Sequence, residues 1–329
     1  MTSDSLNRPP IEVGGIVATG WNLYRKHFSQ YALIALRGHL WLFIPATIGT
    51  LVGNLGAQLP DRYVGLSLLL AVAFIVFYII CGAKYFGWVT GVSRLAYQNL
   101  RGTVDEREAL RFTRSRQYPL LGTNLLKGLI LTIPTIVWLI AVGIIAGRSG
   151  LTFEMLEQPE LIDPAVVGRI ILISLPVSLI FLVLVVWLGL RTMLADQSLA
   201  IEQESDAISA IGRSWKLVKG SVLRSFLVVF VAYLFILPVS FLLSTFGQAI
   251  SVSLFNVVPP EEVVLNSVGD ALPYVGAAVV LTIFSTLAGV ITVPLWQTMA
   301  TTLYVRLVEK LMGESLAADG AGGQPAIDG

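Results

Sequence analysis

Three ionisable side chains lie inside long apolar runs of the sequence, where they are candidates for holding or moving a charged ligand: Arg37, His39 and Lys127. An ionisable group is costly in the hydrocarbon core of a membrane, so it indicates a lipid-headgroup pocket or a solute path. Arg37 and Lys127 lie about eight residues (~12 Å) into their runs, a depth from which a long side chain can snorkel to the headgroups. No acidic residue lies in the same runs. We therefore expect both cations to be unpaired and to snorkel, with a pocket for a lipid phosphate or a transport path as the alternatives.

His39 is shorter and deeper, so we expect it to be a hydrogen-bonded core residue rather than a proton relay. The remaining acids gather in two predicted outer loops, where a solvated loop is a simpler interpretation than a cation site. These acids are Glu154, Glu157, Glu160 and Asp163 in one loop, and Glu261, Glu262 and Asp270 in the other. The sequence has no Gly-rich phosphate loop, no Cys or His pair at metal-ligand spacing and no G-x-S-x-G motif. It predicts no catalytic residue, no metal site and no cofactor.

The composition is that of a membrane protein. Of 329 residues, 55% are hydrophobic and 13% are charged, and the mean hydropathy is +0.77. A soluble domain carries about 25% charged residues. The net charge of +1 argues against a nucleic-acid-binding protein, which needs a concentrated basic surface. The single cysteine, Cys81, lies in an apolar run and is predicted to be a small buried residue.

Six apolar stretches are long enough to cross a bilayer as helices, since a span needs about 20 residues. The N-terminal segment lacks the basic, apolar and cleavage regions of a signal peptide, so we expect the first spans to be uncleaved anchors. The six predicted spans are residues 31–55, 64–86, 119–146, 166–190, 222–250 and 272–297.

The basic residues predict the orientation of these spans. Apart from Arg37 and Lys127, 17 Lys and Arg residues lie on the side that holds both termini, and only Arg62, Arg148 and Arg169 lie on the other. Because basic loops stay in the cytoplasm, we expect both termini to be cytoplasmic. The expected location is a bacterial inner membrane, and an internal membrane such as the thylakoid would show the same bias.

Two short amphipathic segments, 17–28 and 211–222, repeat one pattern ahead of an apolar run. Apolar residues recur at i, i+4, i+7 and i+11, which is one face of a helix, and basic residues lie off that face. Such a helix suits the headgroup boundary, so we interpret both as elbow helices that lie on the inner leaflet. The interfacial residues expected here are Trp21, Tyr24, Arg25 and Lys26 in the first copy, and Trp215, Lys216 and Lys219 in the second.

A degraded third copy favours three repeated units, each an elbow helix followed by a hairpin of spans. It aligns Glu108 with Asp206, and each odd-numbered span carries a proline: Pro45, Pro134 or Pro238. The expected fold is an all-α polytopic bundle in one membrane domain, 1–312, with units at about 11–100, 104–200 and 204–312. Residues 313–329 are small and polar, and are expected to be a disordered tail.

Three G-x-x-x-G motifs can bring helices into close contact, either within the bundle or with a partner. They lie at 49–53, 87–91 and 143–147.

The segments GWNLYRKHF (20–28), VSRLAYQNLRGTVDEREALR (92–111) and DAISAIGRSWKLVKGSVLRSF (206–226) resemble a loose group of bacterial six-span membrane proteins. The group includes the membrane domain attached to some glycerophosphoryl diester phosphodiesterases, and related families of unknown function. The resemblance covers roughly residues 11–312. The hydrolase itself works through a separate barrel of roughly 250 residues, for which this chain has no room, so the resemblance does not imply that activity.

The expected function is therefore non-catalytic. The leading hypothesis is an accessory protein, scaffold or assembly factor that binds anionic lipid of the inner leaflet and a membrane-protein partner or a second copy of itself. The rival hypothesis is a transporter or channel for a small solute or lipid, with a path lined by Arg37, His39 and Lys127. No nucleic-acid partner is expected.

Overall fold

The computed structural model describes residues 12–57, 64–152, 155, 163–202, 206–255 and 268–321. These residues form helices joined by short turns, with no strand among them, which confirms the all-α fold. The acids Glu154, Glu157, Glu160, Glu261 and Glu262 lie outside the described residues.

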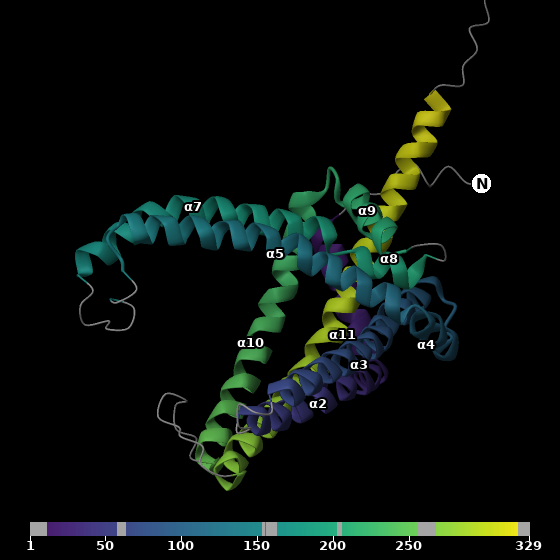
Figure 1. Ribbon diagram of the computed structural model, residues 1–329. Coiled ribbons are helices and arrows are strands. Elements are labelled where there is room, and N and C mark those ends of the chain that lie inside the picture. The colour runs from purple at the N-terminus through teal and green to yellow at the C-terminus, as the bar shows by residue number, and fades with distance from the viewer. Residues whose placement is uncertain are drawn as a thin grey trace, which may run out of the picture.

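Six long helices contain the six predicted spans. Each is long and apolar enough to cross a membrane, so the chain is a multi-pass integral membrane protein. They are arranged as three hairpins, α2–α3, α5–α7 and α10–α11 (Figure 1). The bounds are Phe28–Ala57 for α2, Val64–Arg101 for α3, Gln117–Arg148 for α5, Pro164–Thr192 for α7, Val222–Phe255 for α10 and Val268–Ala321 for α11. Helix α11 thus continues beyond Gly313, where the sequence placed the start of the tail.

A short helix precedes each hairpin: α1 (Val13–Lys26), α4 (Glu106–Ser115) and α9 (Ala207–Val218). The helix expected ahead of the third span is therefore present, but the alignment of Glu108 with Asp206 is wrong. Asp206 caps α9 by accepting from the backbone N–H of Ser209 at 2.7 Å, and Asp105 caps α4 by accepting from that of Glu108 at 3.0 Å. Because an N-cap fixes the first turn of a helix, Asp105 is the counterpart of Asp206.

Counted from these caps, the same positions are buried in each short helix. The fourth residue after the cap is Ala109 in α4 and Ala210 in α9. The eighth is Thr113 in α4 and Ser214 in α9. All four residues are fully buried. Helices of this length are marginal alone in water, so their packing against the hairpins must stabilise them.

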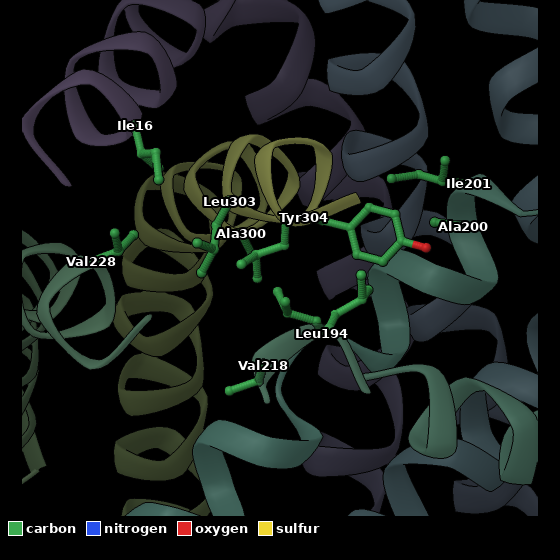
Figure 2. Packing of buried hydrophobic residues seen from close by; sticks show 11 residues of the cluster. Ile16, Leu194, Ala200, Ile201, Val218, Val228, Ala300, Leu303 and Tyr304 are labelled. Atoms are coloured by element: carbon green, nitrogen blue, oxygen red, sulfur yellow. The ribbon is translucent and has the colours of Figure 1, made fainter. Parts of the chain in front are cut away.

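The apolar core lies where the short helices meet the hairpins. Side chains from α1, α9, α10, α11 and the fourth short helix, α8 (Ala195–Ile201), form one buried cluster around Leu194, Leu303 and Tyr304 (Figure 2). A second cluster joins α2, α3 and α4 around Tyr31 and Leu95. Outside the hydrocarbon, burying an aliphatic side chain contributes about 1.5–3 kcal/mol. Between lipid-exposed helices this driving force is absent, so packing there depends on close contact and hydrogen bonds.

Away from the core, one hairpin diverges from the other two. In Figure 1, α5–α7 points away from α2–α3 and α10–α11, and all three come together near α4, α8 and α9. In the most apolar windows of α5 and of α7, none of the residues is buried within the protein. This hairpin is therefore open to lipid or to another protein along most of its length.

The G-x-x-x-G motifs differ in use. A Cβ added at Gly87 would lie 3.1 Å from the Cβ of Gln117, and one added at Gly91 would lie 2.7 Å from Leu110, so this motif seats α4 and the start of α5 on α3. In contrast, Gly143 and Gly147 on α5 face open space. The motif at 87–91 is thus used inside the bundle, and the motif at 143–147 is free for a partner.

Candidate functional site

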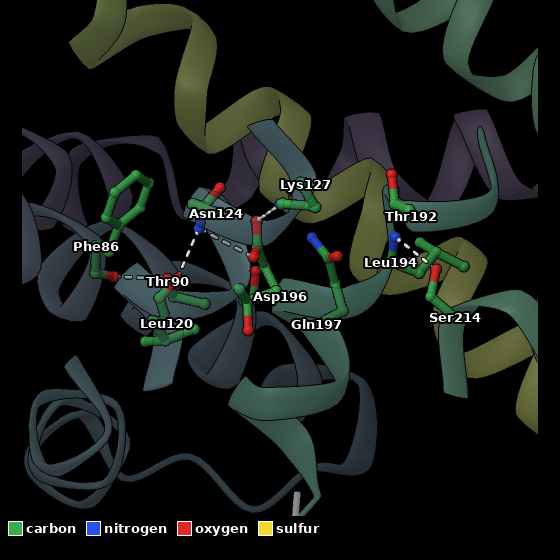
Figure 3. Close-up of polar contacts among 12 residues, drawn as sticks. Phe86, Thr90, Leu120, Asn124, Lys127, Thr192, Leu194, Asp196, Gln197 and Ser214 are labelled. Carbon is green, nitrogen blue, oxygen red and sulfur yellow. Dashed lines mark hydrogen bonds and ion pairs between the residues drawn. The ribbon is translucent and has the colours of Figure 1, made fainter. Parts of the chain in front are cut away.

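The sequence predicted an unpaired Lys127, but in the structure its side chain forms an ion pair. Its Nζ lies 2.6 Å from Oδ2 of Asp196, and Asn124 donates to Oδ1 of the same carboxylate at 3.1 Å (Figure 3). Both charged side chains are largely buried, at 16% and 18% exposure. The pair arises because α7 ends at Thr192 and the chain restarts as α8, which turns Asp196 toward α5. Sequence reasoning missed Asp196 because it lies just outside the fourth predicted span.

His39 is enclosed by neighbouring helices. Its Nδ1 lies 2.8 Å from the carbonyl oxygen of Ala35, and its ring meets that of Tyr85 edge-on, with 5.2 Å between the centroids. Gly289 of α11 presses against the ring, since an added Cβ would lie 2.1 Å from Nε2. The ring therefore acts as a packed, hydrogen-bonded part of the α2–α3–α11 contact.

Arg37 lies apart from both of these groups. Its side chain is exposed, and its guanidinium lies 5.7 Å from the centre of the Trp88 ring. The three residues considered as a path are therefore in three different surroundings: Arg37 on an aromatic ring at the surface, His39 within a helix contact, and Lys127 in an ion pair.

The apolar stripe of α1 packs against the protein itself. Trp21 stacks on Phe235 of α10 at 5.2 Å, and the Tyr24 hydroxyl donates to the carbonyl of Ile291 at 3.0 Å. Arg25 and Lys26 are exposed on the opposite face. Burial raises the pKa of Tyr24, so its hydroxyl remains a proton donor across the physiological range.

Helix α9 is arranged in the same way. Trp215 meets Trp187 of α7 edge-on at 5.3 Å, and Arg191 both lies over the Trp215 ring and donates to its carbonyl at 2.9 Å. Lys216 and Lys219 are exposed. An apolar stripe beside a basic face predicts a helix at the boundary between apolar and polar surroundings. The pattern does not show whether the apolar stripe contacts lipid or the protein's own helices.

A buried polar contact joins one helix from each hairpin region. The Ser93 hydroxyl of α3 donates to Oε1 of Gln297 in α11 at 2.5 Å, and Nε2 of Gln197 in α8 donates to the same oxygen at 3.1 Å. All three side chains are buried. One amide oxygen therefore ties the three hairpins together at the end where the core lies.

Ion pairs surround this junction on the side of the short helices. Arg94 pairs with Glu108 at 3.0 Å, and Arg213 pairs with Glu202 at 3.1 Å. Burial lowers the pKa of Arg213, but Glu202 and Tyr304 together outweigh burial, so the pKa is raised overall. Tyr304 donates to the same carboxylate. Both acids are thus engaged within the protein.

One cavity has four cations among its seven lining residues. It has a volume of about 510 Å³, lies where α3, α4 and α5 meet, and is called the α4 pocket below. The Arg114 guanidinium lies 4.8 Å from the centre of the Trp88 ring, which Arg37 also contacts. Lys84 lies over the Trp41 ring at 5.8 Å. The lining residues are Lys84, Arg107, Leu110, Arg111, Arg114, Ser115 and Gln117.

Sequence reasoning did not single out the α4 pocket, although its arginines were counted among the cytoplasmic charges. The signal was the spacing of Arg107, Arg111 and Arg114, which places them on one helix face.

Comparison with protein-family models, with curated proteins and with solved structures finds no match to this chain.

Proposed function

We propose that this protein is a non-catalytic accessory or scaffold protein of a bacterial inner membrane, with both termini in the cytoplasm. In this proposal it binds anionic lipid through the basic faces of its short helices, and a membrane-protein partner or a second copy through its exposed hairpin. We include it in the six-span group that its motifs resemble. The observation that carries the proposal is that the short helices pack their apolar faces into the protein and hold cations outward.

The lipid part rests on how these cations are held. Arg25, Lys26, Lys216 and Lys219 are exposed on helices held by aromatic contacts to α10 and α7, so their charges are presented by a rigid surface rather than by mobile loops. Each basic residue near an anionic membrane surface contributes about 1 kcal/mol of attraction. Four of them can enrich anionic lipid around the protein without a specific pocket.

The partner part rests on the α5–α7 hairpin. Its apolar windows have no buried residue, and Gly143 and Gly147 lie on α5 with open space beside them. Small residues let a second helix approach closely, which is how helices associate in lipid. A partner helix on this face would cover a surface that the chain's other helices leave open.

The lipid part is tested by extracting the protein with its surrounding membrane in polymer-bounded nanodiscs and measuring the lipid classes. We expect anionic lipid to be enriched over the bulk membrane. A variant with Arg25, Lys26, Lys216 and Lys219 all changed to Gln should lose most of that enrichment. An unchanged lipid profile would contradict the proposal.

The partner part is tested in the same nanodiscs by mass spectrometry of co-purifying proteins and of the protein's own stoichiometry. Gly143→Leu/Gly147→Leu should abolish the association, because the added side chains fill the approach face. Gly168→Leu, which adds the same side chain on an open face of α7, is the matched control. A wild-type protein that is always a single, unaccompanied chain would rule out this part.

A further inference from the structure

The cations of the α4 pocket come from two helices. Arg107, Arg111 and Arg114 recur at i, i+4 and i+7 on α4, which places them on one face, and Lys84 of α3 lines the same cavity. Like charges at this spacing repel one another. The arrangement is unfavourable alone and becomes favourable with an anion bound between the side chains.

The acids of α4 are turned away from the pocket. Glu106 accepts a hydrogen bond from Gln30 of α2 at 2.7 Å, and Glu108 pairs with Arg94 and accepts from Gln98. Within the described part of the chain, none of the four pocket cations is in an ion pair. Among the described residues, no acid therefore neutralises the positive charge of the pocket through an ion pair.

The pocket is pre-formed by packing. Gly87 and Gly91 let α4 and the start of α5 lie directly on α3, and Leu110 and Thr113 fill the contact. The Arg114 guanidinium is held on Trp88. Holding cationic side chains in place before binding reduces the entropy lost when a ligand binds.

The depth of the pocket indicates where its ligand resides. Lys84 lies near the end of the predicted span 64–86, and Gln117 lies just ahead of the span 119–146. The pocket therefore opens where two spans leave the hydrocarbon. Trp88, just beyond the first of these spans, lies beside it, as expected for an aromatic residue at headgroup level.

We propose that the α4 pocket binds one phosphate-bearing anion, with the headgroup of an anionic phospholipid as its source. Arginine suits this ligand because its planar fork can donate two hydrogen bonds to phosphate oxygens. Four cations against one ligand favour a headgroup with more than one negative charge, such as that of cardiolipin. This inference deepens the lipid part of the proposed function and rests on it, but it requires one tightly held lipid at a defined site.

The test uses the full chain in nanodiscs that contain phosphatidylcholine with either phosphatidylglycerol or cardiolipin. The protein is released into detergent micelles and the lipids that remain bound are counted by native mass spectrometry. We expect one anionic lipid per chain. Arg107→Gln/Arg111→Gln should weaken its retention by roughly 30-fold, at about fivefold for each cationic contact. The single variant Arg111→Gln should show an intermediate loss.

The matched control is Arg148→Gln/Arg169→Gln, which removes the same charge from exposed positions at the far ends of α5 and α7, outside the pocket. Its retained lipid should stay within about twofold of wild type, because a single local contact is unaffected by charges beyond the Debye length of ~10 Å. Thermal unfolding of both variants checks that each is folded. Equal losses in the two variants would overturn the pocket while leaving general lipid enrichment intact.

A second arm separates lipid from soluble phosphate. Pyrophosphate is added to the protein in nanodiscs of phosphatidylcholine alone, and binding is measured by calorimetry. Weak or absent binding, together with retained anionic lipid, is the expected result. Tight pyrophosphate binding that is lost in Arg107→Gln/Arg111→Gln would support the phosphate site and overturn its lipid source. No retained lipid and no anionic enrichment would overturn both the pocket and the lipid part of the proposed function.

Discussion

At the scale of residues, the Lys127–Asp196 pair is the structure's largest departure from a simple membrane helix. The two charges lie 2.6 Å apart, largely buried, and the Asn124 amide supplies a further hydrogen bond to the carboxylate. A buried pair gains little net stability, because taking both charges out of water costs about as much as their attraction returns. Losing one partner is different, since the other charge is then left buried alone.

This difference gives a measurable prediction. Lys127→Met should lower the free energy of unfolding by about 3 kcal/mol, whereas Lys127→Met/Asp196→Leu should recover at least half of that loss. Unfolding in detergent, followed by circular dichroism, measures both. The control Arg306→Met removes an exposed ion pair to Glu309 and should change stability by less than about 1 kcal/mol. Additive losses in the double variant would show that the two charges are not coupled.

At the scale of elements, small residues decide where the short helices dock. Gly20 of α1 lies against Met299 of α11 so closely that an added Cβ would be 3.0 Å from the Met299 Cα. Its counterpart in α9, counted from the cap, is Ser214, which is fully buried and hydrogen-bonds to the carbonyl of Arg191 at 2.7 Å. The repeated position is thus always a small side chain at a helix crossing.

Gly20→Ala should therefore loosen α1. The added Cβ would clash with backbone as well as side-chain atoms of Met299, so α1 must move away from α11. The backbone amides of α1 should then exchange hydrogen at least tenfold faster, which corresponds to a loss of about 1.4 kcal/mol of local stability. Hydrogen exchange read by mass spectrometry measures this. Gly15→Ala, on the same helix but with only Glu12 nearby, is the control and should slow exchange slightly. Equal protection in both variants would contradict a tight crossing at Gly20.

The elements themselves were largely predictable, whereas their contacts were not. Length and hydropathy suffice for the six spans, and the period of the apolar stripe suffices for α1 and α9. The same stripe could not show that Trp21 faces Phe235 rather than lipid, because both are apolar surroundings. The α4 pocket was hidden for a related reason: its cations come from α3 and α4, and only the close approach at Gly87 and Gly91 brings them together.

At the scale of the whole molecule, the three hairpins are joined at one end, and away from it α5–α7 points away from the other two (Figure 1). The joined end holds the apolar core, the Ser93–Gln197–Gln297 contact and the exposed cations of the short helices. Since basic residues stay in the cytoplasm, this joined end should be the cytoplasmic one. A rigid base with a separately exposed α5–α7 hairpin fits a protein that holds lipid on one side and a partner in the membrane.

The orientation can be tested on two exposed positions at opposite ends of the second hairpin region. Helix α5 has 32 residues, or ~48 Å at 1.5 Å per residue, so Arg148 at its far end and Lys219 near the joined end should lie on opposite sides of the bilayer. The background is Cys81→Ala, which removes the one native, buried thiol. In sealed vesicles with the cytoplasmic face inside, a membrane-impermeant maleimide should label Arg148→Cys at once and Lys219→Cys only after permeabilisation. The reverse pattern would show that the protein is inverted in the membrane, with the α4 pocket and the short helices outside the cytoplasm. Labelling of both positions from one side would contradict a membrane crossing by α5.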